Sequence, residues 1–265
     1  MLKWVHWIMA RNTLKNLESS IDWKINKPLF LLGSVAPDIN IAFPVHTIDK
    51  TRERFLNRIV KVETTKSYLV KSFYMGVVNH YICDYFCYAH NLGRIDPAHA
   101  IYERFMKNHL KKHTDTISKV SDDIRYQFDE IGKHVIEELY DFKDTKDNDI
   151  FSKFRMTPIN KNVSDLISAV QVNSRDHAEF IMNIICKVHN KYLEDIDSLI
   201  KDRWFVQLDR ILLDLNYANE VSHRVTKLLA TIQDQMDTSA MQAEFCKFIC
   251  QDNASELGVN KYFIQ

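Results

Sequence analysis

Residues 76–90 form an almost continuous apolar stretch, GVVNHYICDYFCYAH, interrupted internally by Asn79, His80 and Asp84. A helix that is apolar on every side is typically buried on every side. A carboxylate inside such a helix must be paired or bound to a metal, because an isolated buried charge is costly. His80 and Asp84 are four residues apart, so a helix places them on one face. The stretch therefore predicts a buried helix with a polar, ligand-like centre.

Glycine and proline are scarce, with five residues of each among 265. Proteins contain roughly 7% glycine and 5% proline on average, and β-hairpins and tight turns use both. We therefore expect an all-α fold: a multi-helical single domain with a metal site among buried helices and a possible C-terminal helical extension. Helical spacing of apolar residues is found in residues 2–20, 97–113, 119–140, 162–200, 203–235 and 238–250.

Basic and acidic residues are balanced at 35 each, so the chain lacks the overall basic character typical of nucleic-acid-binding proteins. Its five cysteines form no disulfide framework in a chain of this length, which favours reduced thiols. The beginning of the chain lacks the apolar core of a signal peptide, and no window approaches the roughly 18 apolar residues of a membrane span. We expect a cytoplasmic protein that binds no nucleic acid.

A second group of potential metal ligands follows the apolar stretch. His90 precedes residues 91–93, whose sequence Asn-Leu-Gly is typical of a helix end. Residues 96–97, Asp-Pro, are typical of the start of the next helix. On that helix His99 and Glu103 are again four residues apart, so they share one face.

Further candidate ligands lie upstream. His6 falls in a helical segment, and Asp38 and His46 fall in the irregular segment 28–46, which holds three of the five prolines. A catalytic zinc takes about three protein ligands and a water, so eight candidates suggest two or three ions sharing a carboxylate. The alternative is that they are ordinary buried polar residues. The candidates are His6, Asp38, His46, His80, Asp84, His90, His99 and Glu103.

The motif formed by these residues is similar to that of a known family. The pattern H-x3-D-x5-H followed by H-x3-E is present as His80, Asp84, His90, His99 and Glu103. It resembles the zinc-dependent phospholipase C family, whose superfamily also holds the S1/P1-type nucleases. The resemblance covers roughly residues 1–110, with upstream counterparts in the same order.

The resemblance implies a ligand set. One zinc would be held by Asp38, His46, His80 and Asp84, and a second by His90, His99 and Glu103. The family's third zinc uses counterparts of His6 and Asp84 together with the amino terminus. Here Met1 lies only five residues before His6, less than half the family's separation, so we expect two zinc ions and leave the third open.

The resemblance also implies a reaction, metal-assisted hydrolysis of a phosphodiester in a phospholipid or a related small-molecule or lipid phosphoester. Asp38 would be the catalytic carboxylate that orients the attacking water, and Phe43 would line the substrate pocket. Peripheral contact with a membrane is compatible with such a substrate. The alternative function is a non-catalytic, zinc-stabilised helical scaffold or binding protein that retains the fold.

The segment 141–158 is the best candidate for a linker or long loop. We accordingly describe residues 1–140 as a zinc-binding, phospholipase C-like helical core and residues 141–265 as C-terminal helices, and we expect both to belong to one domain. Trp4 and Trp7 could line an apolar mouth for a lipid. Aromatic residues on a helix usually pack inward, so we expect both in the core.

Overall fold

The computed structural model describes residues 1–18, 25–39, 46–91, 97–112, 174–202 and 207–231, with a few positions between 124 and 134. Every regular element in these residues is helical, which confirms the all-α prediction. The elements are α1 (Lys3–Glu18), α2 (Lys27–Val35), the 3-10 helix η1 (Ala36–Ile39), α3 (Ile48–Thr64), α4 (Tyr68–Tyr85), α5 (Tyr88–Asn91), α6 (Pro97–Lys112), α11 (Ser174–Asp202) and α12 (Gln207–Thr231).

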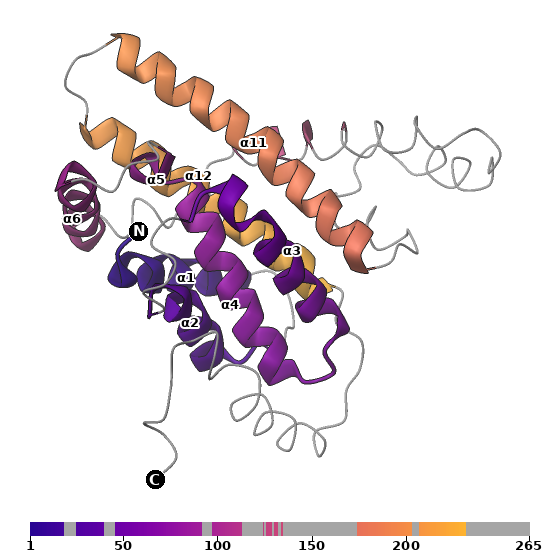
Figure 1. Ribbon diagram of the computed structural model, residues 1–265. Helices are drawn as coiled ribbons and strands as arrows, with labels where there is room; N and C mark the ends of the chain where they lie inside the picture. Colours follow the sequence, from indigo (N-terminus) through magenta and orange to yellow (C-terminus); the bar gives the residue numbers. More distant parts are fainter. Residues whose placement is uncertain are drawn as a thin grey trace.

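Helix α4 is the centre of the structure, as its apolar sequence predicts. All but its first two residues are buried. Helices α1, α2, α3 and α12 pack around it (Figure 1). Ser67 caps its amino end by accepting a hydrogen bond from the Val70 N–H at 3.4 Å. The polar residues of α4 are therefore held in the middle of the molecule.

Two glycines allow α2 and α4 to touch through their backbones. A Cβ at Gly76 would lie 2.0 Å from the Phe30 carbonyl oxygen, and one at Gly33 would lie 2.0 Å from the Phe73 carbonyl oxygen. Only glycine permits such an approach of two helix backbones. The contact holds α2, and with it the η1 turn that follows directly, close to α4.

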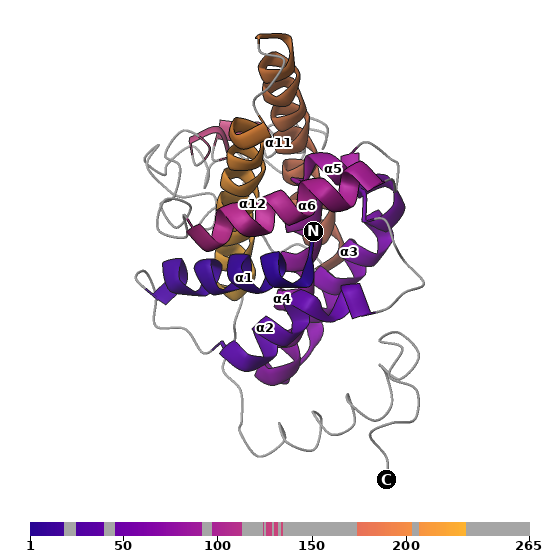
Figure 2. The ribbon, with the colours of Figure 1, turned by 90° about the vertical axis from the view of Figure 1, so that its left-hand side faces the viewer.

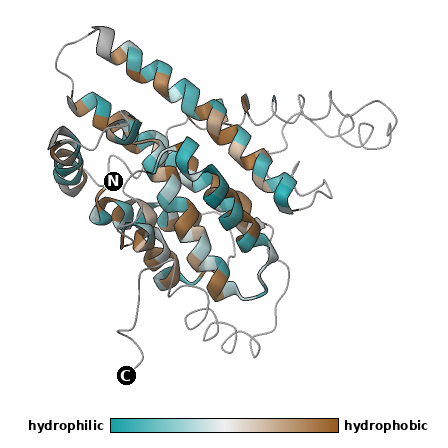
Figure 3. Ribbon diagram, in the orientation of Figure 1, coloured by the Kyte–Doolittle hydropathy of each residue, from teal (hydrophilic) through white to brown (hydrophobic). Residues whose placement is uncertain are grey.

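Helices α11 and α12 belong to the C-terminal half of the chain. Hydrophilic and hydrophobic residues alternate along α11 (Figure 3), and its apolar side packs on α3, while α12 packs on α1 and α4. The described part of the C-terminal half is thus continuous with the N-terminal core. The proposed boundary at residues 140 and 141, the candidate linker and the helical pattern at 238–250 lie outside the described residues.

Helices α6, α1 and α2 form a layer on one side of the molecule, facing the viewer in Figure 2. Helices α4 and α12 lie behind this layer. Among the described residues, no helix combines the length and apolarity needed to cross a membrane.

The glycine contact generates a prediction about stability. Gly76→Ala should lower the free energy of unfolding by at least about 2 kcal/mol, because the new methyl group collides with the α2 backbone rather than with a side chain that can move. Urea denaturation measures the change. Asn190→Ala, at an exposed position of α11, is the control and should stay within about 0.5 kcal/mol of the parent protein. Equal stability of the Gly76→Ala variant would contradict the close approach.

Candidate metal centre

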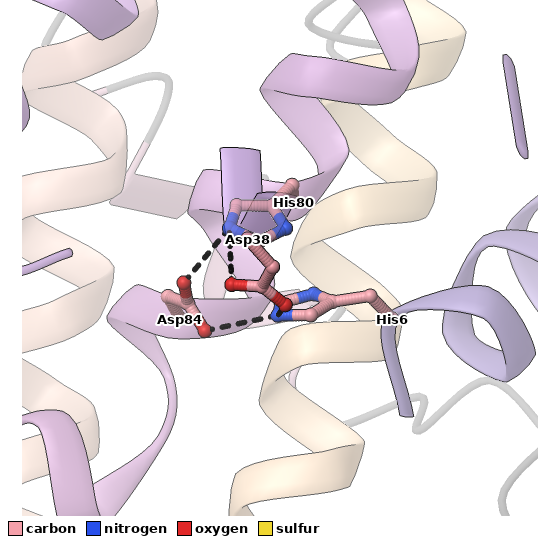
Figure 4. Close-up of side chains that lie close together, drawn as sticks. All are labelled: His6, Asp38, His80 and Asp84. Carbon is pink, nitrogen blue, oxygen red and sulfur yellow. Dashed lines mark ion pairs between the residues drawn. The ribbon is translucent and has the colours of Figure 1, made fainter. Parts of the chain in front are cut away.

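Four side chains from three elements meet beside α4. His6 comes from α1, Asp38 from η1, and His80 and Asp84 from successive turns of α4 (Figure 4). Each offers one nitrogen or oxygen atom, and these atoms lie within 4.8 Å of one another. The His80 Nε2 atom is 3.1 Å from Asp84 Oδ2 and 3.6 Å from Asp38 Oδ1. The four-residue spacing on α4 thus brings its histidine and aspartate together.

The backbone selects which nitrogen of His80 faces this group. The Nδ1 atom lies 2.9 Å from the carbonyl oxygen of Ser34 on α2. A carbonyl oxygen only accepts, so Nδ1 carries the proton and Nε2 presents its lone pair. This is the arrangement that orients histidine ligands in metal sites. The close contact of α2 with α4 therefore prepares His80 as a ligand.

His46 joins the same group from the residue pair that precedes α3. Its Nδ1 atom lies 2.7 Å from Asp84 Oδ2 and 2.9 Å from His80 Nε2. Five of the eight candidate ligands thus converge at this end of α4.

A second group contains His90, His99 and Glu103, whose candidate ligand atoms also lie within 4.8 Å of one another. Glu103 Oε1 is 3.3 Å from His90 Nε2 and 3.1 Å from His99 Nε2. The His99 Nδ1–H donates to the Ala89 carbonyl oxygen at 3.2 Å, so in the neutral imidazole the lone pair is on Nε2, the nitrogen that faces Glu103. The tautomer of His99 is thus selected in the same way as that of His80.

A break in the helix between α4 and α5 brings His90 to this position. Helix α4 ends at Tyr85, and α5 begins at Tyr88. Had α4 continued, a residue six positions after Asp84 would be rotated by about 240° and would face away from it. Instead His90 Nε2 lies 3.5 Å from Asp84 Oδ1.

Asp84 connects the two groups through its two oxygens. Oδ2 faces His46 and His80, and Oδ1 lies 3.2 Å from His6 Nε2 and 3.5 Å from His90 Nε2. A carboxylate placed in this way can bridge two ions. The side chain of Asp84 is fully buried.

The amino group of Met1 lies between the groups. It forms a short ion pair with Asp84 and is 2.6 Å from His90 Nε2 and 3.2 Å from Glu103 Oε1. The short spacing from Met1 to His6 therefore does not keep this amine away from the centre. The nearby carboxylates of Asp84 and Glu103 outweigh the effect of burial and raise the pKa of the amine.

Burial and neighbouring charge set the protonation states of the centre. Burial and the proximity of His80 lower the pKa of His6 to about 4, so its imidazole is neutral at pH 7. Burial alone would raise the pKa of Asp84, but His90, the Met1 amine and His6 hold it well below its usual range. Burial alone would also raise the pKa of Glu103, but its contacts with His90 and His99 and the charge of the Met1 amine lower it. Asp84 and Glu103 are therefore ionised at neutral pH.

These residues fit zinc. Both ring nitrogens of His6, the Asp38 Oδ2 atom and His90 Nδ1 are buried without a hydrogen-bond partner. Buried polar atoms are almost always satisfied in folded proteins, so a cluster that leaves several unsatisfied is one that a ligand completes. Imidazole nitrogens and carboxylate oxygens are the donors that zinc accepts in catalytic sites. The assignment of individual residues to individual ions stays a prediction.

The structure adds one residue that we did not single out from the sequence, Asp214 on α12. Its buried carboxylate accepts hydrogen bonds from the Tyr88 backbone N–H, the Tyr102 hydroxyl and the Tyr192 hydroxyl, at 2.8, 2.8 and 2.7 Å. Tyr88 and Tyr102 are close neighbours of His90 and Glu103 in the chain. Asp214 therefore ties the elements that carry the second ligand group to α11 and α12. Its position in the apolar run ILLDLNYA is the same signal that singled out Asp84.

The remaining sequence expectation for the site concerns Phe43. It lies outside the described residues, so its role as a pocket residue stays a prediction.

The model of the zinc-dependent phospholipase C family matches residues 5–212, which is more than half of the sequence and includes all the candidate ligands. Neither the curated proteins nor the solved structures contain a significant match.

Removal of the metal should destabilise the protein. A ligand that binds only the folded state raises its stability by mass action, so excess zinc should raise the thermal midpoint and a chelator should lower it. His6→Ala should lose most of this zinc response. His177→Ala is the matched control and should keep the zinc response. His177 on α11 is also buried, but its partner is Glu63 on α3, 2.5 Å away. An unchanged zinc response in the His6→Ala protein would remove His6 from the ligand set.

Asp214 should make stability depend on pH. Burial raises the pKa of this carboxyl to about 7, despite the three hydrogen bonds that stabilise its ionised form. Between the unfolded pKa of 3.8 and this value the folded protein binds more protons, so the contribution of Asp214 to stability falls as pH rises through that window.

The test compares Asp214→Asn with the parent protein by urea unfolding at pH 5 and pH 8, with zinc in excess. Asparagine does not titrate, so the variant should not share the loss of stability that the parent shows from pH 5 to pH 8. The free energy of unfolding of the variant, relative to that of the parent, should therefore rise by on the order of 1–4 kcal/mol between these pH values. A constant difference between the two proteins would show that Asp214 does not titrate in this range.

Proposed function

Since the chain belongs to the zinc-dependent phospholipase C family, we propose that it is a zinc-dependent hydrolase that cleaves a phosphodiester bond in a phospholipid or related lipid phosphoester. The observation that carries the proposal is the pair of ligand groups joined by Asp84. Two groups that share a carboxylate suit a reaction in which attacking and leaving oxygens are both stabilised.

We assign one zinc to the group around His80, namely His6, Asp38, His46, His80 and Asp84, from which that ion would draw its ligands. A second zinc would be held by His90, His99 and Glu103, and Asp84 would face both. The Met1 amine lies where it can contribute a further nitrogen. When bound, zinc acts as a Lewis acid that activates water and neutralises the charge of the phosphoryl group.

Asp38 is our candidate for the catalytic carboxylate. Its side chain is 19% exposed, whereas those of His6, His80 and Asp84 are fully buried. Oδ1 faces His80 at 3.6 Å, and Oδ2 lies 3.7 Å from His6 Nε2. Asp38 can therefore accept a hydrogen bond from a water that enters the centre, orient it and take up its proton at Oδ2. The buried residues around it keep bulk water out, which strengthens these interactions.

A cytoplasmic location also stays a prediction, compatible with the free thiols of Cys83, Cys87 and Cys186, which are the described cysteines. The substrate is expected to be a lipid phosphoester, in line with the family.

The decisive measurement combines zinc analysis with hydrolysis of a panel of phosphodiesters and phosphomonoesters. The parent protein should contain zinc and hydrolyse phospholipids, and His80→Ala should lose both properties. Asp38→Asn should lose about 10²–10⁴-fold in kcat, as expected for a general base. Asn190→Ala, at an exposed position of α11, is a control that should keep both properties.

Three outcomes would contradict the proposal. Full activity in a zinc-free His80→Ala protein would exclude the metal mechanism. An Asp38→Asn protein with its zinc and full activity would exclude the role of Asp38. If protein ligands fill every coordination position of the bound zinc, and the parent protein hydrolyses nothing in the panel, the chain is instead a non-catalytic scaffold.

A further inference from the structure

Most of the exposed large hydrophobic residues in the described part of the chain belong to one layer of helices. Seven large hydrophobic side chains are exposed in the described part of the chain, and five of them belong to α1, to α2 with η1, and to α6. These elements form the layer that faces the viewer in Figure 2. The five are Trp4, Leu32, Ile39, Ile101 and Phe105, each 45–51% exposed. Our expectation that Trp4 packs in the core is therefore wrong.

The exposed charges on the same elements are of one sign. Among the residues of α1, α2, η1 and α6 whose side chains the structure describes, which leave out positions 18, 97–98 and 111–112, the exposed charged side chains are all basic, namely Lys3, Arg11, Lys15, Lys27 and Arg104. The exposed acidic side chains in the described part lie instead on α3, α11 and α12: Asp49, Glu53, Asp176, Glu194, Asp197 and Asp209. A chain with zero net charge thus presents a basic and apolar side.

Apolar and basic residues are interleaved on this side. On α1, Trp4, Arg11 and Lys15 are separated by seven and four residues, so they lie on one helix face. On α6, Ile101 and Phe105 are four residues apart with Arg104 between them, opposite the face that carries Glu103. A helix with large apolar and basic residues on its outer face is typical of binding at a membrane surface.

The accessible edge of the metal centre belongs to the same elements. Asp38 on η1 is 19% exposed, His99 on α6 is 15% exposed and Glu103 on α6 is 11% exposed, whereas the His80 and Asp84 side chains on α4 are fully buried. Asp38, His99 and Glu103 are therefore the partly exposed ligands carried by these elements, whereas His6 on α1 is as buried as His80 and Asp84.

We propose that the outer surface of α1, α2, η1 and α6, here called the docking face, binds the surface of an anionic phospholipid membrane. Its apolar side chains would enter the boundary between headgroups and acyl chains, and its basic side chains would contact anionic headgroups. A nucleic acid would match the charge but not the exposed leucine and isoleucines. A second copy of the same face would be repelled by its like charge.

This inference deepens the proposed function and rests on it for the identity of the substrate, since it states where the lipid phosphoester is met. A protein docked in this way brings η1 and α6, which carry the partly exposed ligands Asp38 and His99, next to the membrane. The lipid headgroup would then have a short path from the membrane to the centre.

Flotation with vesicles of phosphatidylcholine alone, or of phosphatidylcholine mixed with phosphatidylglycerol, tests the inference. The parent protein should bind the anionic vesicles and should bind the zwitterionic vesicles weakly. The double variant Arg11→Glu with Lys15→Glu should lose at least about tenfold in partition to anionic vesicles. The matched control is Lys61→Glu with Lys66→Glu, at exposed positions outside the docking face. It should bind anionic vesicles at least several-fold more tightly than the docking-face double variant.

The apolar contribution has its own pair of variants. Trp4→Ser with Phe105→Ser should weaken binding by about tenfold, because it removes two large apolar groups from the interface. Tyr126→Ser with Leu208→Ser is the control, since these two exposed hydrophobics lie outside the docking face. All four substituted residues are exposed, so thermal midpoints should stay close to that of the parent protein.

Equal binding of docking-face variants and controls would overturn the inference. So would variants that lose affinity for a single-stranded DNA oligonucleotide while their affinity for vesicles is unchanged.

Hydrolysis of a short-chain phospholipid below its micellar concentration separates the inference from the proposed function. The docking-face variants should retain this activity. If the parent protein hydrolyses the soluble lipid but docking-face and control variants bind vesicles equally, only the docking inference fails. If it hydrolyses no phosphodiester but shows the expected vesicle binding, the proposed function fails and the docking surface stands.

Discussion

The structure depends on the contacts that the buried carboxylate of Asp84 makes with the histidines and the amine around it. It lies on the central helix, fully removed from solvent, and its two oxygens face different groups of histidines. A charge in this position is tolerated only because positive or metal-binding partners surround it. Other elements therefore have to deliver such partners: α1 brings His6, the segment before α3 brings His46, and α5 brings His90.

The delivery of these partners depends on backbone contacts as much as on side chains. Gly33 and Gly76 let α2 approach α4 until the Ser34 carbonyl reaches His80, and the same approach places η1 with Asp38. On the other side, Asp214 holds the backbone at Tyr88 and so the position of α5. The centre is thus supported by one close helix contact and by one buried hydrogen-bonded carboxylate.

Much of this arrangement could be predicted from the sequence, and the limits have physical causes. The apolar surroundings and four-residue spacing of His80 and Asp84 predict a buried helix with two ligands on one face, and the structure contains it. The position of His90 could not be derived in this way, because it depends on a helix break within an apolar run. Nor could the approach of Met1 to the centre, which depends on the packing of α1 against the rest of the fold.

Trp4 is exposed because α1 turns its histidine inward, and helical periodicity alone does not decide which of two faces is buried. The assignment of residues to individual zinc ions remains a prediction.

The distribution of the ligands along the chain has a consequence for how the protein matures. The centre takes residues from α1, η1, α4, α5 and α6, and its second group is supported by α12. The second group lies within residues 90–103, but the first takes ligands from α1, η1 and α4. A chain emerging during synthesis therefore cannot assemble both groups until α6 has formed and docked. Metal uptake would then be one of the last events of folding and would report that the helices have packed correctly.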